Sequence, residues 1–185
     1  MKHILPIITI TTLAAAASAQ TAAASSGLSY NNASVSYSRL SLSGYTGHAN
    51  GWAVSANALI GSSNVLVSAQ TTVGGDLGNG SDDVSIGYVF KNLALGADAI
   101  VSVGSDETYE LAIRKDLGSN IEVAVNFAQV AGENVYGLSV GYSVTKAITL
   151  GLGYSRTSGF DASDYLVGAT NVKLSGWTVG VRYNF

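Results

Sequence analysis

The amino-acid sequence predicts an all-β fold, a transmembrane antiparallel up-and-down β-barrel of about ten strands, with eight strands as the alternative count. Three observations support this fold. Large apolar residues alternate with small or polar residues over most of the 185-residue chain, which is the period of a β-strand. Beyond residues 1–19 no apolar run is long enough for a membrane-spanning helix. The one proline is Pro6, so every later segment can pair in a sheet.

The first 19 residues have the pattern of a secretory signal peptide. A short basic start precedes an apolar stretch, and the small residues Ala17 and Ala19 stand where signal peptidase cleaves. The alternative, an amphipathic helix of the mature domain, is disfavoured because the apolar stretch has no polar face. We therefore expect a signal peptide at residues 1–19 and one barrel domain at residues 20–185.

Ten alternating stretches, each bounded by Gly, Ser, Asn or Asp, are the expected strands. In order they cover residues 30–40, 51–61, 64–74, 83–91, 93–104, 107–115, 120–129, 134–145, 147–156 and 172–185. The connections after the even-numbered strands are tight, such as Lys91-Asn92 and Thr145-Lys146, and those after the odd-numbered strands are longer and more polar. An even strand number puts both chain ends on the side of the tight turns. We call this end of the barrel the turn side and the opposite end the loop side.

Each strand has a large apolar face and a small or polar face. The fourth strand alternates Val84, Ile86, Tyr88 and Phe90 with Asp83, Ser85, Gly87 and Val89, and the eighth alternates Tyr136, Leu138, Val140 and Tyr142 with Gly137, Ser139, Gly141 and Ser143. A water-soluble sandwich would bury the large face and show charge on the other. We therefore expect the large face to contact lipid and the small face to line a lumen.

Outward aromatic residues fall into two bands, as in the aromatic girdles at the two surfaces of a membrane. The loop-side band is Tyr37, Trp52, Tyr109, Phe127, Tyr136, Tyr154 and Trp177; the turn-side band is Tyr88, Phe90, Tyr142, Tyr183 and Phe185. A soluble barrel has no reason to separate its aromatic residues in this way. The two bands therefore favour a membrane barrel.

The chain ends in an aromatic pattern that includes Thr178, Gly180, Tyr183 and the final residue, Phe185. A polar residue, a glycine and two aromatics two positions apart resemble the C-terminal β-signal of bacterial outer-membrane proteins. With the signal peptide and the strands, the chain resembles small Gram-negative outer-membrane β-barrel proteins. The resemblance implies location in the bacterial outer membrane and recognition of Gly180, Tyr183 and Phe185 by the barrel-assembly machinery. It implies no particular activity.

Five charged residues fall at inward positions: Asp98, Glu110, Arg114, Glu122 and Arg182. A hairpin centred near Gly118 would place Arg114 opposite Glu122, and Glu110 opposite Asn126. Charges in a partly desolvated lumen need partners. The pattern therefore predicts a structural network of ion pairs that closes the lumen, and the alternative is a charged constriction in a narrow pore.

We accordingly expect a structural or surface-interaction barrel, with a narrow passive porin-like channel for ions or small solutes as the alternative. Outer-membrane lipids and lipopolysaccharide are the expected partners, and the expected oligomeric state is a monomer. The formal net charge of −3 and the absence of a basic cluster disfavour nucleic acid. The chain has no Cys, which excludes disulfides and a lipidated Cys.

An enzyme is not expected, because His48 is the one histidine after the signal peptide and lies in a loop. No cofactor or metal site is expected either. The Gly-rich residues 74–80 lack a following Lys or helix, so a flexible loop is preferred to a phosphate site. Eight acids lie in or beside loop-side connections, where they form a solvated surface or an acidic rim for cations or a basic partner: Asp76, Asp82, Asp83, Asp106, Glu107, Glu133, Asp161 and Asp164.

The connection at residues 157–171 mixes apolar Phe160, Tyr165, Leu166 and Val167 with acidic side chains. Apolar residues in a loop mark either contact with another molecule or packing across the barrel mouth. The sequence predicts one of these two roles and leaves both open.

Overall fold

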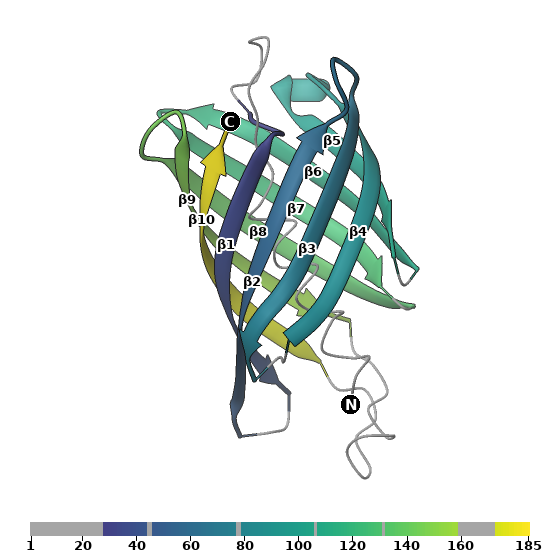
Figure 1. Ribbon diagram of the computed structural model, residues 1–185, viewed down its shortest axis with the longest axis vertical. Helices are drawn as coiled ribbons and strands as arrows, with labels where there is room; N and C mark the ends of the chain where they lie inside the picture. The colour runs from purple at the N-terminus through teal and green to yellow at the C-terminus, as the bar shows by residue number, and fades with distance from the viewer. Residues whose placement is uncertain (1–27, 44–45, 77–78, 106, 131, 159–172) are drawn as a thin grey trace.

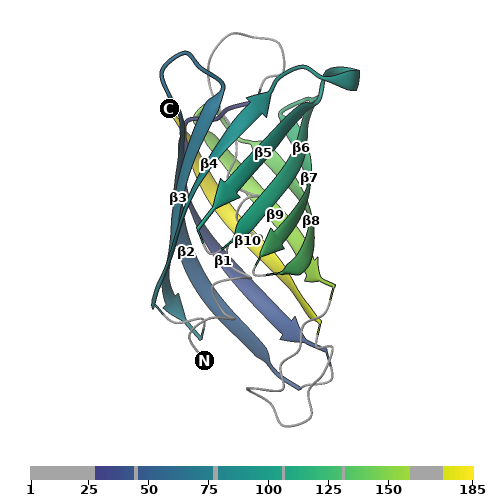
Figure 2. The ribbon, with the colours of Figure 1, turned by 90° about the vertical axis from the view of Figure 1, so that its right-hand side faces the viewer.

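The computed structural model describes residues 28–43, 46–76, 79–105, 107–130, 132–158 and 173–185. Ten antiparallel strands form one closed barrel (Figures 1 and 2). They are β1 (Asn32–Leu42), β2 (His48–Leu59), β3 (Val65–Gly75), β4 (Asn79–Phe90), β5 (Asp98–Gly104), β6 (Thr108–Gly118), β7 (Ile121–Val130), β8 (Glu133–Ser143), β9 (Ile148–Thr157) and β10 (Leu174–Asn184). The predicted signal peptide, Asp106, Asp161, Asp164 and nearly all of the loop at residues 157–171 lie outside the described residues.

Each strand pairs with its sequence neighbours, and the barrel is closed by β1 and β10. Their register runs from Asn32 opposite Asn184 to Leu42 opposite Leu174. The predicted ten-stranded up-and-down fold is therefore confirmed, and the eight-strand alternative is wrong. Closure leaves no strand edge unpaired, which a barrel in lipid requires because lipid offers no hydrogen-bond partners.

The exterior is apolar along the strands. Large side chains such as Val84, Ile86, Leu150 and Leu152 are exposed, and they alternate with buried inward positions. No helix in the described part of the chain is long and apolar enough to cross a membrane. A closed barrel with this exterior presents the surface that hydrocarbon requires. The structure is thus that of a membrane-spanning β-barrel.

The aromatic residues of the loop-side band form cross-strand pairs. Tyr37 lies opposite Trp52, with ring centroids 5.1 Å apart. The rings of Phe127 and Tyr136 are 5.5 Å apart, and those of Tyr154 and Trp177 are 4.9 Å apart. On the turn side, the rings of Tyr88 and Phe90 are 4.9 Å apart, and those of Tyr183 and Phe185 are 6.3 Å apart. Both predicted bands therefore lie on the outer surface.

The predicted tight turn at Lys91-Asn92 is wrong. The expected strand at 93–104 begins only at Asp98, and residues 91–97 include the short 3-10 helix η1 (Ala94–Gly96). Asn92 and Leu95 have φ values of 54° and 62°, so neither can continue a strand. The backbone N–H of Asn92 donates to the Asp98 carboxylate at 2.7 Å, which fixes the connection at its end.

The sequence predicted longer connections on the loop side than on the turn side, and this prediction is wrong for three loop-side connections. On the loop side, residues 76–78, 105–107 and 131–132 join successive strands. Strands continue into segments with many Gly and Asn residues that resembled loops in the sequence; Val73, for example, still pairs with Asn79. No proline interrupts these ladders, so the backbone keeps pairing.

Residues 28–30 lie inside the barrel rather than in its wall, although the sequence predicted a first strand over residues 30–40. Tyr30 is 1% exposed. Leu28 and Tyr30 form a buried apolar cluster with four inward residues of β3 to β6, namely Leu66, Val89, Ile100 and Ala112. The chain therefore places an apolar segment within the turn-side half of the lumen before it enters β1.

Candidate functional site

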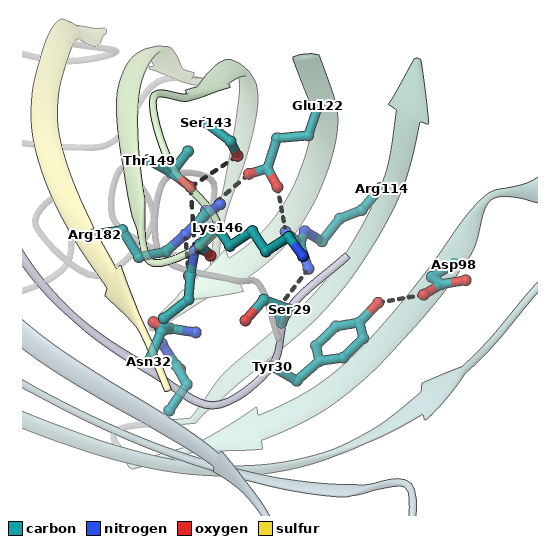
Figure 3. A network of polar contacts seen from close by, with 12 residues as sticks. Ser29, Tyr30, Asn32, Asp98, Arg114, Glu122, Ser143, Lys146, Thr149 and Arg182 are labelled. Carbon is teal, nitrogen blue, oxygen red and sulfur yellow. Dashed lines mark hydrogen bonds and ion pairs between the residues drawn. The ribbon is translucent and has the colours of Figure 1, made fainter. Parts of the chain in front are cut away.

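A chain of ion pairs crosses the lumen in its turn-side half (Figure 3). Glu122 on β7 accepts from Arg114 on β6, with Nη2 and Oε2 3.2 Å apart. Its other oxygen, Oε1, lies 2.7 Å from Arg182 Nη1 on β10. Arg114 and Arg182 are 1% and 3% exposed, and Glu122 is 15% exposed. One carboxylate therefore links two buried guanidinium groups on opposite parts of the wall.

The register of this network differs from the sequence prediction. Arg114 lies opposite Ala124, and Glu122 lies opposite Asp116. The hairpin turns at Ser119 and Asn120, both with positive φ, and a bulge between Asp116 and Gly118 precedes the turn. The predicted opposition of Arg114 and Glu122 is therefore wrong, although the long side chains still meet on the diagonal.

The same shift affects the second predicted pair. Glu110 lies opposite Ala128 rather than Asn126. Asn126 Nδ2 nevertheless donates to Glu110 Oε1 at 3.4 Å. Glu110 makes no ion pair within the described residues, and the structure does not bring it to Arg114. It belongs to a separate layer of polar groups nearer the loop side.

Tyr30 connects the N-terminal segment to this network, and the sequence analysis missed it. Its hydroxyl donates to Asp98 Oδ2 at 2.5 Å, and the Arg114 guanidinium lies over its ring, 5.2 Å from the centroid. Arg114 also donates to the Ser29 carbonyl at 3.5 Å. Burial raises the pKa of Tyr30 above its usual range, so the hydroxyl remains a donor. The alternation of the first predicted strand could have indicated this role, because it places Tyr30 on the same inward face as Asn32.

A set of amide and hydroxyl groups surrounds Arg182 at the same height. Arg182 Nε donates to Asn184 Oδ1 at 3.1 Å, and Asn184 Nδ2 donates to Thr149 at 3.2 Å. Asn57 Nδ2 donates to Asn32 Oδ1 at 3.1 Å. These bonds join β9 to β10 and β1 to β2, the two strand pairs on either side of the pair that closes the barrel.

A cavity of about 600 Å³ lies at the turn-side mouth. Its lining includes both partners of the ion pair between Glu122 and Arg182, and also Leu28, Ser29 and Lys146. The cavity therefore ends at the ion-pair network and at the N-terminal segment. Within the described residues no group of three or more His, Cys, Asp or Glu is arranged to hold a metal ion.

The other candidate residues lie elsewhere. His48 Nδ1 and Ser41 Oγ are 2.9 Å apart on exposed side chains of the first hairpin. Asp76 accepts from the backbone N–H of Asn50 at 3.0 Å. Asp83 points into the barrel, where Ser105 donates to it, so it is not part of an acidic rim. Of the other predicted rim acids, Asp82 and Glu107 are exposed and Glu133 is half-buried.

Comparisons with known proteins give similarities among solved structures. No protein-family model and no curated protein sequence matches the chain. Among solved structures, the KdgM porin is similar at 17% identity and a TM-score of 0.44, covering 82% of this chain and 99% of its own. Neisserial surface protein A is similar at 16% identity and a TM-score of 0.40, covering 84% and 96%. Outer membrane protein Omp33 of Acinetobacter baumannii is similar at 13% identity and a TM-score of 0.34, covering 84% and 99%.

Proposed function

We propose that the protein is a structural or surface-interaction barrel whose lumen is closed to ions and solutes. The observation that carries this proposal is the link from Arg114 through Glu122 to Arg182, which joins side chains of three strands across the lumen. A pore would need these groups to stand apart and line a water-filled path. Here they are buried against one another.

The N-terminal segment supports the same proposal from the other half of the wall. Leu28 and Tyr30 pack against inward residues of β3 to β6, and the Tyr30 hydroxyl and ring contact Asp98 and Arg114. Ion pairs on one side and an apolar segment on the other thus both occupy the turn-side half of the lumen. Removing one partner of a buried ion pair costs about 3–5 kcal/mol, so the arrangement resists thermal opening.

Planar-bilayer recording of the refolded mature chain tests the proposal. We expect no discrete openings from protein that migrates as a folded, heat-modifiable barrel. Two variants supply the comparison: Tyr30→Ala combined with Leu28→Ala removes the apolar segment, and Lys115→Ala changes an outward charge as the control. Discrete openings of the unchanged protein, altered by Arg114→Ala, would overturn closure and establish the narrow-channel alternative.

A further inference from the structure

We propose that the outward face of β8 to β10 and β1 binds one phosphorylated lipid of the outer leaflet, of the lipid A class. The phosphate would lie beside Arg39 and Arg156, and an acyl chain would lie in the apolar groove below them. The proposal rests on the barrel lying in an outer membrane, and it is independent of whether the lumen conducts.

Two arginines lie on either side of β10 near the loop side. Arg39 on β1 is opposite Trp177, and Arg156 on β9 is opposite Ser175. Both side chains are exposed on the outer surface, and neither forms a salt bridge within the described part of the chain. Strands in a sheet are about 4.8 Å apart, so β1 and β9 are roughly 10 Å apart. The two arginines are also offset by two residues along β10, so their backbones are roughly 12 Å apart. Two extended arginine side chains at that separation can reach the same headgroup.

An apolar groove of about 300 Å³ lies directly below Arg156 toward the membrane centre. Leu138, Val140, Leu152, Tyr154 and Trp177 line it. Tyr154 lies opposite both Leu138 and Trp177, and Val140 lies opposite Leu152. The tilted rings of Tyr154 and Trp177 contact each other at one end of the groove, and Tyr154 is two residues along β9 from Arg156. An acyl chain in this groove would bring its headgroup to the arginines.

The charge on the rest of the loop-side rim makes this sector distinct. Three strands from β1, the exposed outward residue at the same end of β4 is Asp82. Asp76, after β3, accepts hydrogen bonds from Asn50, the residue opposite Arg39. An anionic headgroup is therefore repelled near β4 and attracted to the side of β10, between Arg39 and Arg156. Guanidinium groups bind phosphate through paired hydrogen bonds. Phosphate above and hydrocarbon below is the chemistry of a phosphorylated lipid.

A tryptophan reporter tests the site, because the chain has two tryptophans and Trp52→Phe leaves Trp177 in the groove. The full mature chain carrying this change is refolded in detergent and titrated with purified lipid A while Trp177 emission is recorded. We expect saturable binding that weakens by about tenfold or more in Arg39→Gln with Arg156→Gln, since charged hydrogen bonds contribute about 1.5–3 kcal/mol each.

Matched controls separate the site from general charge effects. Lys115→Gln with Lys146→Gln removes the same charge on the turn side and should leave binding within about twofold. Dephosphorylated lipid A should bind weakly, and inorganic phosphate alone should leave Trp177 emission unchanged. Equal binding of lipid A by the double arginine variant, equal binding of the dephosphorylated lipid, or the absence of saturation would each overturn the proposal. Heat-modifiable migration of every variant shows that the barrel has folded.

Discussion

Gly141 on β8 provides the space in which the side chain of Glu122 crosses the neighbouring strand. The two residues are opposite each other in the β7–β8 register. A Cβ atom at Gly141 would lie 2.7 Å from Glu122 Cγ and 2.8 Å from Oε1. The absence of a side chain at this one inward position therefore lets the carboxylate extend over β8 toward Arg182.

Gly141→Ala should destabilise the barrel by about 1–3 kcal/mol, because the new methyl group forces Glu122 away from at least one arginine. Urea unfolding in detergent micelles measures the loss. In a Glu122→Ala background, the same glycine substitution should cost much less, because its steric partner is gone. Equal costs in the two backgrounds would show that Gly141 matters for another reason.

Glu122→Ala should destabilise the barrel more than Arg114→Ala. Removing the carboxylate leaves two buried guanidinium groups without their shared partner, whereas removing Arg114 leaves the pair of Glu122 and Arg182 intact. Losses of about 3–5 kcal/mol are expected for an uncompensated buried charge. Lys115→Ala, an outward change on the same strand as Arg114, should have little effect on the unfolding midpoint. The reverse order of Arg114 and Glu122 would contradict the bridging role of the carboxylate.

Tyr30 should make stability fall at alkaline pH. Because burial raises its pKa above the ordinary value of 10.0, the protonated phenol stabilises the folded barrel. That contribution is complete below about pH 10 and decreases as the pH rises toward the higher folded pKa. Tyr30→Phe should remove this part of the pH dependence, which unfolding at a series of alkaline pH values measures. If the free energy of unfolding of Tyr30→Phe fell with pH as steeply as that of the unchanged protein, burial would not be what keeps Tyr30 protonated.

Phe185→Ala, or deletion of Phe185, should reduce the amount of assembled barrel and increase degradation in the periplasm. The side chain is 59% exposed, so its loss removes little packing from the folded state. Any large effect must then arise during assembly, as the resemblance to the β-signal implies. Phe185→Tyr should be mild. Membrane fractionation and heat-modifiable migration measure both results, and normal barrel levels after deletion would exclude a role in assembly.

The antiparallel barrel, a count of about ten strands and the two faces of the wall could be predicted from the sequence alone. These follow from local properties: a period of two, the absence of proline after Pro6, and the placement of outward aromatics such as Trp52 and Trp177. Because each side chain must face either lipid or lumen, the alternation fixes its side without knowledge of its neighbours. The five inward charges could be identified for the same reason.

Which of those charges form ion pairs depends on the tertiary structure. The turn at Ser119 and Asn120 and the bulge between Asp116 and Gly118 shift the β6–β7 register, and the partners of Arg114 and Glu110 change with it. Arg182 reaches Glu122 although β8 and β9 lie between their strands, because the wall closes into a barrel and Gly141 leaves room. The placement of Tyr30 against Asp98 and Arg114 likewise depends on where the chain enters the lumen. Such contacts join residues distant in sequence, so the local pattern carries no signal for them.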